Sequence, residues 1–524
     1  MIPLYTTRQI READEYALKH YGIPGSILME NAARSIFELV ESNFSEEINF
    51  KTIGIICGRG NNGGDGFALA RNFLVNEYSV TVVSLGDEKN LKGDALFNFN
   101  ILKRMCASNK NINIIGYKNQ KSLSVLDDCE IIVDALLGTG TKGALSEEYT
   151  SIISYLNNLN SIKVAVDIPT GLDADTAAGE EIFIADMTVS LSELKSGLYY
   201  GKGYLNAGKV VKGSIGIGSG YYDKLEVSEY LIEPEDAFNF LPSKDLAAHK
   251  YSAGKVLVIA GSGEYSGAAF LTADAVMKSG AGACTLAFPR SIKNIALQKM
   301  DVPTVLAYED YSLEHLSVKS IKDLDEKMKW ADCVAIGPGL RRHPETLEAV
   351  RILLNKYRTK PFIIDADALY ALGDGEYKKT ILTDRVLTPH LKEFADLIGI
   401  SLVELQNNTM NLAKKFVKEN NCYLVLKGAP SIIFTPAGEA IINSSGNPGM
   451  GKFGTGDVLT GFISGMTAQS DSIEESVIAS VYIHSLAADL LIKNKTVYGM
   501  TSKDILENLP DAIKFIYDTF ASDF

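Results

Sequence analysis

The chain has 524 residues, of which 51 are lysine or arginine and 65 are aspartate or glutamate, so its formal net charge is −14. This length suggests two to four domains, and a composition of 46% hydrophobic and 22% charged residues is that of a globular protein rather than a disordered or fibrous one. The acidic balance argues against nucleic acid or an anionic membrane as the main partner, because both reward basic surfaces, but it allows a small anion held by local backbone N–H groups.

The N-terminal residues and the spacing of the cysteines predict a cytoplasmic protein. No run approaches about 18 apolar residues, so no membrane span is expected. Charged residues such as Arg8 and Arg11 stand where a secretory signal needs an apolar core. The six cysteines form no CxxC pair, so the sequence predicts neither a zinc site nor a disulfide framework.

Short apolar runs alternate with segments of helical period in the first half. The helical segments are 66–78 and 96–105, and the apolar runs predict strands at 51–57, 79–85, 130–137, 163–169 and 187–191. Nearly continuous apolar strands are typical of parallel sheets that are covered on both faces. The alternation therefore predicts βαβ units in a doubly wound α/β sheet.

A glycine-rich passage at 197–220 and the polar, acidic segment after it suggest a domain boundary at about 222–235. The alternation then restarts, with strands expected at 255–262, 284–289, 333–339, 361–369, 385–389, 423–428 and 431–436. We therefore expect two α/β domains, over residues 1–222 and 226–522.

The first predicted strand runs into a GxGxxG pattern at Gly58, Gly60 and Gly63, and a helical segment follows. Glycines in this context let the backbone turn sharply and approach a pyrophosphate, and Asp87 lies at the distance expected of a ribose-binding acid. A tight turn without a ligand is the alternative. The polar run from Asn61 to Asp65 favours a ligand, because a plain turn needs no side-chain oxygens there.

Two other strand ends in the first half carry similar groups. Asp134 precedes a glycine-rich loop that starts at Gly138, and Asp167 precedes Thr170. Because the carboxyl ends of parallel strands share one edge, these groups and Asn62 are expected in one crevice, where their hard oxygens suit an alkali or alkaline-earth cation. One or two of the aspartates could instead cap helices. Lys195 follows another strand and is either solvated or an electrostatic or acid–base group.

The strongest local pattern of the second half is Gly454-Thr455-Gly456-Asp457 at the start of an apolar helix. Its amides can cradle the negative charge that develops on a transferred phosphoryl group, and Asp457 can accept a proton from an attacking hydroxyl. A helix-capping aspartate is the alternative. Lys427, at the end of another strand, is placed to meet a nucleotide phosphate, and His390 precedes a helix.

Two family resemblances cover almost the whole chain. The first half resembles the NAD(P)H-hydrate epimerase domain through GRGNNGGDG, VDALLGTGTKG, VDIPTGLDAD and SELKSGL. The second half resembles the ribokinase-like, ADP-dependent NAD(P)H-hydrate dehydratase domain through HKYSAGKVLVIAGS, IGPGL, DADAL, LTPHLKEF, LVLKG and NPGMGKFGTGDVLTG. The resemblance implies a Rossmann-like domain followed by a ribokinase-like domain. It also implies interconversion of the R and S hydrates of NADH and NADPH (NADHX and NADPHX), and dehydration of the S form at the expense of ADP.

The resemblance also implies site residues and cofactors. Potassium would be bound by Asn62, Asp134 and Thr170. The hydrate in the first domain would be bound by Asn61, Asn62, Gly63, Gly64, Asp65, Gly138, Thr139, Gly140, Thr141, Lys142, Gly143, Ala144 and Asp167, with Lys195 and Asp167 as catalytic candidates. In the second domain Ala268, Gly339, His390 and Asp457 would face the hydrate, with Asp457 as base and Mg²⁺ as cofactor. ADP would be bound by Lys427, Gly428, Ala429, Pro430, Ser431, Asn447, Pro448, Gly449, Met450, Gly451, Lys452, Phe453, Gly454, Thr455 and Gly456.

Two positions depart from the family pattern, and three other functions compete. Arg341 and Phe453 stand where the family commonly has glycine. The competing functions are a small-molecule kinase with a nucleotide-sensing Rossmann domain, a nucleotide-sensing module without activity, and a dehydrogenase suggested by GxGxxG. We expect small-molecule nucleotides (NADHX, NADPHX and ADP) as partners, no nucleic acid, no membrane, and assembly as a homo-oligomer.

Overall fold

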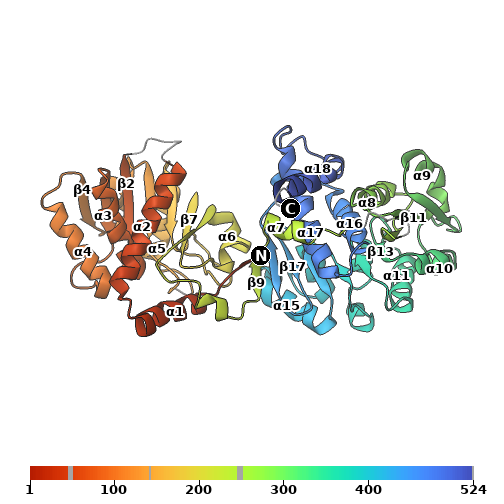
Figure 1. The fold of residues 1–524 in the computed structure, drawn as a ribbon, viewed down its shortest axis with the longest axis horizontal. Coiled ribbons are helices and arrows are strands. Elements are labelled where there is room, and N and C mark those ends of the chain that lie inside the picture. The colour runs from red at the N-terminus through yellow and green to blue at the C-terminus, as the bar shows by residue number, and fades with distance from the viewer. Residues whose placement is uncertain (45–50, 141–142, 245–248, 250–251, 522–524) are drawn as a thin grey trace. The chain divides into compact units, whose positions relative to one another are not determined.

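The computed structural model describes residues 1–44, 51–140, 143–244, 249 and 252–521. Its contacts divide the chain into two compact units, one of Pro3–Glu229 and one of Tyr230–Phe524 with Met1–Ile2. Each unit is built on a largely parallel sheet with helices on its faces, which confirms the predicted α/β class (Figure 1). Nowhere in the described ranges is there a helix both long enough and apolar enough to span a membrane.

The N-terminal unit contains a seven-stranded parallel sheet in the order β4-β3-β2-β5-β6-β7-β8. The five strands predicted in this half are confirmed, whereas β4 and β8 were not predicted, and β8 lies inside the glycine-rich passage. The strands are β2 (Thr52–Cys57), β3 (Ser79–Ser84), β4 (Ile112–Gly116), β5 (Ile131–Ala135), β6 (Ile162–Val166), β7 (Met187–Leu191) and β8 (Lys209–Gly213).

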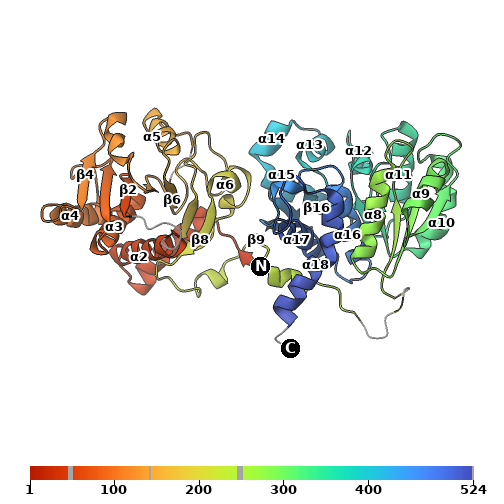
Figure 2. The ribbon, with the colours of Figure 1, turned by 90° about the horizontal axis from the view of Figure 1, so that it is seen from above.

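Helices cover both faces of this sheet (Figure 2). Alternate side chains of β2 face opposite sides, because successive residues of a strand point to opposite faces. Ile55 therefore packs with α2, α3 and α4, whereas Ile56 packs with α5. The helices of this unit are α1 (Thr7–Tyr16), α2 (Gly25–Phe44), α3 (Asn61–Val75), α4 (Gly93–Cys106), α5 (Glu147–Asn157) and α6 (Gly201–Asn206).

The larger sheet has the order β1-β9-β18-β17-β16-β15-β14-β13-β10-β11-β12. Pairing is parallel from β16 through to β12 and antiparallel among β16, β17 and β18. All seven strands predicted in the second half are present, and β1, β9, β12 and β18 of this sheet are additional. The strands are β1 (Ile2–Pro3), β9 (Glu229–Leu231), β10 (Lys255–Ile259), β11 (Ala283–Pro289), β12 (Thr304–Tyr308), β13 (Cys333–Ile336), β14 (Phe362–Ile364), β15 (Val386–Leu387), β16 (Tyr423–Leu426), β17 (Ser431–Phe434) and β18 (Ala440–Asn443).

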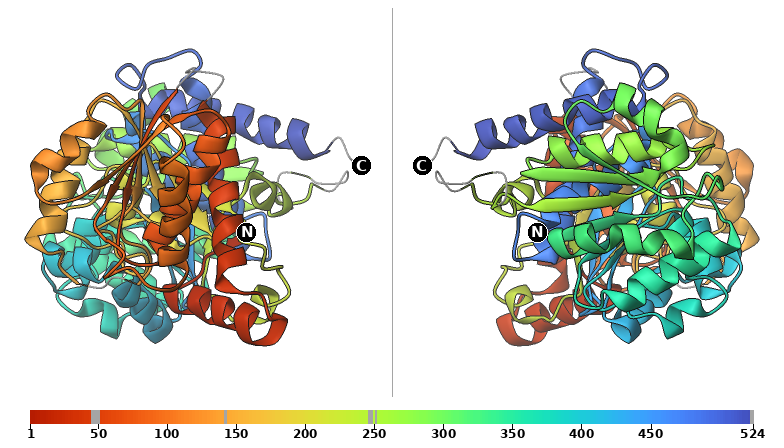
Figure 3. Two further views of the ribbon diagram at one scale, coloured as in Figure 1. Left: turned by 90° about the vertical axis from the view of Figure 1, so that its left-hand side faces the viewer. Right: turned by 90° about the vertical axis from the view of Figure 1, so that its right-hand side faces the viewer.

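The C-terminal unit also carries helices on both faces of its sheet (Figure 3). One hydrophobic core contains buried residues of α16, α17 and α18 together with the inward residues of β14 to β18. The helices are α7 (Pro234–Asn239), α8 (Ser266–Lys278), α9 (Lys293–Lys299), α10 (Ile321–Trp330), α11 (Pro344–Lys356), α12 (Asp367–Tyr370), α13 (Leu391–Ile398), α14 (Leu402–Asn407), α15 (Thr409–Asn420), α16 (Thr455–Thr467), α17 (Ile473–Leu491) and α18 (Ser502–Phe520).

Helix α16 lies directly against α8 because glycines remove side chains from the contact. A Cβ atom on Gly461 would lie 2.1 Å from the carbonyl oxygen of Thr272, and one on Gly465 would lie 2.0 Å from Oγ of Ser279. The neighbouring atom at Gly461 is backbone, so it cannot move aside as a flexible side chain would. The backbone of α8 therefore fixes the position of the helix that begins with Thr455, Gly456 and Asp457.

We predict that Gly461→Ala destabilises the C-terminal unit by about 2 kcal/mol, because overpacking a tight contact typically costs 1–3 kcal/mol. Urea unfolding followed by the fluorescence of Trp330 measures this, since the chain's single tryptophan lies in α10 of that unit. The matched control is Gly267→Ala in α8, where a Cβ atom meets nothing within 4 Å and alanine should stabilise the helix slightly. Equal midpoints for the two variants would contradict the packing argument.

Candidate active sites

The N-terminal unit contains a cavity of about 580 Å³ at the carboxyl ends of its strands. Residues from the loops after β2, β5, β6 and β7 line it, together with one face of α1 and the start of α2. It brings together many of the residues predicted from the sequence, namely Asn61, Asn62, Asp65, Gly138, Thr139, Gly140 and Asp167. Thr141 and Lys142 lie outside the described residues. Gly143 and Ala144 do not line the cavity.

The predicted glycine loop leads directly into α3. Its glycines serve close packing: a Cβ atom on Gly63 would lie 2.0 Å from the carbonyl oxygen of Gly58, and one on Gly64 would lie 2.6 Å from Cε of Met29. Asp87 lies outside the cavity, where its carboxylate accepts hydrogen bonds from the amides of Lys89 and Asn90. The ribose role suggested for Asp87 therefore has no support, because the carboxylate caps its own turn.

Asn62 is the polar group in this cavity that most clearly lacks a partner. The residue is 7% exposed, and within the described chain neither its amide oxygen nor its amide nitrogen has a hydrogen-bond partner. A buried amide without a partner is costly, and native structures seldom keep one without a reason. Its position at the cavity wall makes a bound ion or ligand the natural partner.

Asp134 and Thr170 lie on neighbouring strand ends and contact each other. Oδ2 of Asp134 accepts from the Thr170 amide at 2.8 Å, and Oδ1 accepts from the Thr170 hydroxyl at 2.8 Å. The Thr170 hydroxyl oxygen also accepts from the amide of Leu137 at 3.1 Å. Complete burial raises the pKa of Asp134 to about 6, although these hydrogen bonds oppose the shift. A cation beside this carboxylate would counter the cost of its burial.

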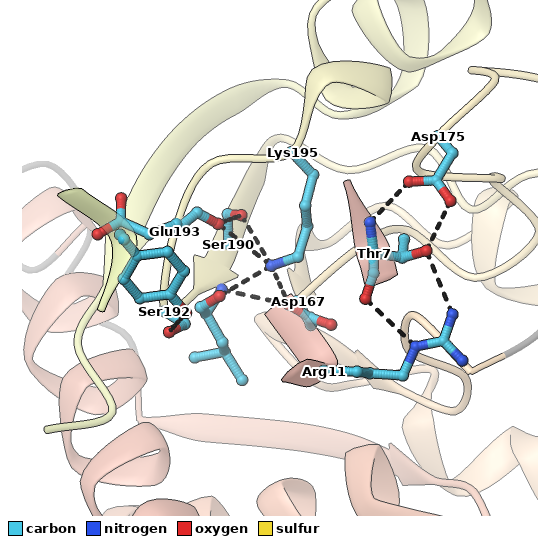
Figure 4. Close-up of polar contacts among 10 residues, drawn as sticks. Thr7, Arg11, Asp167, Asp175, Ser190, Ser192, Glu193 and Lys195 are labelled. Atoms are coloured by element: carbon cyan, nitrogen blue, oxygen red, sulfur yellow. Dashed lines mark hydrogen bonds and ion pairs between the residues drawn. The ribbon is translucent and has the colours of Figure 1, made fainter. Parts of the chain in front are cut away.

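Lys195 forms an ion pair with Asp167 at the cavity wall (Figure 4). Its ammonium is completely buried and donates to Oδ1 of Asp167 at 2.6 Å, to the carbonyl of Leu191 at 2.8 Å and to the hydroxyl of Ser190 at 3.2 Å. The solvated alternative for Lys195 is therefore wrong in this structure. Asp167 itself has a φ of +70°, so the loop holds it in a conformation that residues other than glycine seldom adopt.

Sequence reasoning missed one acidic residue of this cavity, Asp14 of α1. Burial raises the pKa of Asp14 to about 6, with a further contribution from the charge of Asp167. Burial and the charges of Asp167 and Asp14 also raise the pKa of Asp65 well above its usual range. No motif marks Asp14, because only the docking of α1 places it beside residues that lie far away in the sequence. Five carboxyl groups therefore line the cavity, those of Asp14, Glu15, Asp65, Asp94 and Asp167, and the last of them is paired with the buried Lys195.

In the C-terminal unit a second lysine–aspartate pair lies at the strand ends. The Lys427 ammonium donates to Oδ1 of Asp365 at 2.7 Å, and the Thr460 hydroxyl donates to Oδ2 at 2.7 Å. A Cβ atom on Gly456 would lie 3.3 Å from Nζ of Lys427, so the predicted glycine cradle and this lysine are adjacent. The role of Asp365 was not predicted: its carboxylate links β14 to α16 and holds Lys427 in place.

Asp457 lies in the first turn of α16, close to these groups. Burial raises its pKa to about 6, and the charges of Asp365 and Asp367 raise it further against the opposing effect of Lys427. A carboxyl group with such a pKa exists in both protonation states near neutral pH, which suits a general base. His390 is half-exposed, and its Nδ1 accepts from the amide of Glu393, so its ring caps α13.

The predicted nucleotide loop at 447–456 is held from α17. Asp489 accepts hydrogen bonds from the amide of Gly446 at 2.8 Å and from the side chain of Asn447 at 2.9 Å. Gly454 has a φ of +89° and turns the chain into α16. The Lys452 ammonium donates back to the carbonyl of Tyr498 at 2.7 Å, whereas the Phe453 side chain is fully exposed.

Two of the residues expected to face the hydrate in the second domain, Gly339 and Ala268, lie next to each other. A Cβ atom on Gly339 would lie 3.3 Å from Cβ of Ala268 and 2.5 Å from the carbonyl oxygen of Tyr265, so the two loops touch. Arg341, where the sequence pattern favours glycine, has a φ of +71°, and its amide donates to Asp367 at 2.9 Å. The left-handed backbone explains why glycine is preferred at this position. With arginine there, the hydrogen bond to Asp367 helps to hold the backbone in that conformation.

Comparisons with known proteins agree across the whole chain. A family described as YjeF-related protein N-terminus matches residues 25–197, and a family described as NAD(P)H-hydrate dehydratase matches residues 256–511. The chain is 34% identical to the bifunctional NAD(P)H-hydrate repair enzyme Nnr of Moorella thermoacetica over 98% of this chain and 96% of that protein. It is 31% identical to the protein of the same name from Escherichia coli over 95% of this chain and 92% of that one.

Among solved structures, the ADP/ATP-dependent NAD(P)H-hydrate dehydratase of Bacillus subtilis, co-crystallised with ATP and Mg²⁺, is 27% identical. The match covers 55% of this chain and 98% of that one, with a TM-score of 0.47.

We predict that Asp167→Asn lowers the stability of the N-terminal unit by about 3 kcal/mol, because the variant leaves the ammonium of Lys195 buried without a counter-charge. Differential scanning calorimetry measures the loss. Glu88→Gln is the matched control, since Glu88 pairs with Lys103, both side chains are about half-exposed, and such surface pairs contribute less than about 1 kcal/mol. Equal melting temperatures for the two variants would show that the Lys195 pair does not stabilise the fold.

Proposed function

The chain belongs to the bifunctional NAD(P)H-hydrate repair enzymes, and we propose that each of its two units performs one of the two reactions. The N-terminal unit interconverts the R and S forms of NADHX and NADPHX. The C-terminal unit dehydrates the S form to NADH or NADPH at the expense of ADP, with AMP and phosphate as the other products. The observation that carries this proposal is similarity to a whole bifunctional relative, 34% identical over 98% of the chain.

In the C-terminal unit Asp457 would act as general base. It would take the proton of the C6 hydroxyl as that oxygen attacks the terminal phosphoryl group of ADP. The amides at the start of α16, which include Gly456, would stabilise the charge on the transferred group, and Lys427 would neutralise a neighbouring phosphate. Phosphate then leaves C6 with the bonding electrons, C5 loses a proton to solvent, and the C5–C6 double bond that forms restores the dihydronicotinamide ring.

Other residues of this unit would bind the hydrate and ADP. Ala268, Gly339 and His390 would face the hydrate. The two loops at 427–431 and 447–456 would hold ADP. Asp489 holds the start of the second loop through Gly446 and Asn447. The amides of that loop would therefore need little reorganisation when the nucleotide binds.

Mg²⁺ would bind with ADP in the C-terminal unit. The carboxyl groups of Asp365 and Asp367 lie close enough to Asp457 to raise its pKa in addition to the effect of burial, so several carboxylate oxygens are available here beside Lys427. Such a site fits a divalent cation that is shared with nucleotide phosphates. When bound, the ion would neutralise charge on the phosphates and leave the proton of the hydroxyl to Asp457.

Potassium would bind in the N-terminal unit at Asn62, Asp134 and Thr170. These residues supply an amide oxygen, a carboxylate and a hydroxyl, and the Asn62 oxygen has no other partner among the described residues. Hard oxygen donors of this kind fit an alkali cation. Asp167, held by Lys195, is the proposed base for interconversion, and assembly as a homo-oligomer stays a prediction.

The experiment that tests the function supplies NADH hydrate with ADP or ATP in turn and follows the return of the reduced-nicotinamide absorbance. We expect ADP to support recovery. A stable phosphorylated product with no return of absorbance would instead identify a small-molecule kinase. Binding of nucleotide without turnover of any kind would identify a sensing module.

We predict that Asp457→Asn slows dehydration of the S hydrate by 10²-fold or more, because a general base typically contributes about 10²–10⁴-fold. Interconversion of the R and S hydrates should stay at the wild-type rate, since Asp457 belongs to the other unit. Asp167→Ala is the reciprocal variant and should stop interconversion alone. Chromatographic separation of the two hydrates measures both rates. A folded Asp457→Asn protein that dehydrates the S hydrate at the wild-type rate would rule out Asp457 as the base.

We predict that dehydration becomes faster as the pH rises through about 6, the pKa to which burial and neighbouring carboxylates raise Asp457. The sign follows from the role: only the ionised carboxylate accepts a proton, and its fraction increases with pH. The rate should therefore fall towards pH 5 and level off above pH 7, while Trp330 fluorescence verifies that the unit stays folded. A rate that is constant from pH 5 to 8 would contradict the assignment.

A further inference from the structure

Helix α1 is held against the N-terminal site at two places, one of which Figure 4 shows. At its first residue, the amide and the hydroxyl of Thr7 donate to the two oxygens of the Asp175 carboxylate at 2.7 and 2.6 Å. Just before the helix, the amide of Tyr5 donates to the carbonyl of Leu194, the residue that precedes Lys195, at 2.8 Å. The segments that carry Asp167 and Lys195 therefore also position α1.

This docking turns one face of α1 towards the cavity. The lining residues of the helix and its continuation recur with the period of an α-helix, and they are Ile10, Arg11, Asp14, Glu15 and Leu18. Asp14 lies in the middle of this face. Its Oδ1 is shielded from solvent and has no hydrogen-bond partner among the residues that the structure describes. A shielded carboxyl oxygen without a partner, on the wall of a site for a hydroxylated ring, is available to that ring.

We propose that Asp14 is a catalytic residue for interconversion, giving a proton to the C6 hydroxyl on one side of the ring while Asp167 receives one on the other. The inference rests on the proposed function of the N-terminal unit. The family match to this unit begins at residue 25, so α1 lies outside it.

The chemistry balances without any reagent other than water. The proton of Asp14 passes to the C6 hydroxyl, the C6–O bond breaks, and water leaves with the bonding electrons. The lone pair of ring nitrogen N1 forms a double bond to C6, which gives a planar iminium ion. Water then adds to the opposite face of C6, the pair returns to N1, and the Asp167 carboxylate takes the extra proton. Exchange with solvent restores both carboxyl groups.

The charged groups around Asp14 favour Asp14 as the proton donor and Asp167 as the proton acceptor. The titratable groups that face it or line the same cavity are Asp65 of α3, Asp94 of α4, Asp167, Lys195, Tyr222, and Arg11 and Glu15 of its own helix. Lys195 is hydrogen-bonded to Asp167. Asp167 is thus paired as a carboxylate that can receive a proton, whereas Asp14, whose pKa burial raises to about 6, can supply one.

The test compares the full-length wild-type protein with Asp14→Asn, Asp14→Glu and Glu12→Gln. Glu12 lies on the same helix but is exposed and outside the cavity lining, so its variant is the matched control. Interconversion is measured without ADP, by separating the R and S hydrates, across pH 5–8 and in ¹⁸O-labelled water. Dehydration of the S hydrate with ADP is measured in the same preparations.

We expect the wild-type rate of interconversion to decline above pH 6, as Asp14 loses its proton. Asp14→Asn should slow interconversion by 10²-fold or more, abolish that decline, and retain normal dehydration and melting temperature. Asp14→Glu should regain part of the rate, and Glu12→Gln should match the wild type. In the wild type, ¹⁸O should enter the C6 hydroxyl in step with interconversion.

An unchanged rate and pH profile in Asp14→Asn, or interconversion without entry of ¹⁸O, would overturn the role of Asp14 while leaving the epimerase function intact. A wild-type protein that dehydrates the S hydrate but never interconverts the two forms would instead overturn the proposed epimerase function, and the role of Asp14 with it.

Discussion

Parallel strand pairing is the constraint on which both sites depend. Parallel strands deliver their carboxyl ends to one edge of a sheet, so loops from distant parts of the sequence meet there. In the smaller sheet the register pairs Ile56 of β2 with Asp134 of β5, and Asp134 with Ala165 of β6. The loops that carry Asn62, Gly138 and Asp167 therefore emerge side by side. The larger sheet brings Asp365 and Lys427 together in the same way.

Each unit uses one lysine, paired with one strand-end aspartate, in an otherwise acidic site. Lys195 meets Asp167 at 2.6 Å and Lys427 meets Asp365 at 2.7 Å. Under the proposed function, backbone amides of the glycine loops would supply further positive potential, so that a chain with a net charge of −14 could accommodate polyanionic ligands without a basic surface. Contacts such as that between Asp489 and Gly446 hold one of these loops.

Sequence patterns predicted the sheet class and most strand positions, because apolar runs such as 51–57 reflect burial on both faces. They missed β8, whose run Lys209–Gly213 holds only two apolar residues flanked by lysines, and β12, which is half-buried. Motifs identified residues in the first turns of helices that follow glycine loops, such as Asn62 and Asp457. The positions of Asp14 and Asp489 could not be predicted, because each depends on contacts between segments that are distant in the sequence. Lys195 shows the same limit, since its position after a strand does not indicate whether its ammonium is buried.

The anchoring of α1 has a consequence for the order in which the chain is synthesised. Thr7 leaves the ribosome before its partner Asp175, which follows 168 positions later. At 5–20 residues per second the helix waits on the order of ten seconds for the carboxylate that fixes it. The N-terminal cavity therefore gains the wall formed by α1 only after strands β2 to β6 have been made, and α1 is fixed only after helices α2 to α5, which follow it in the chain, have been made.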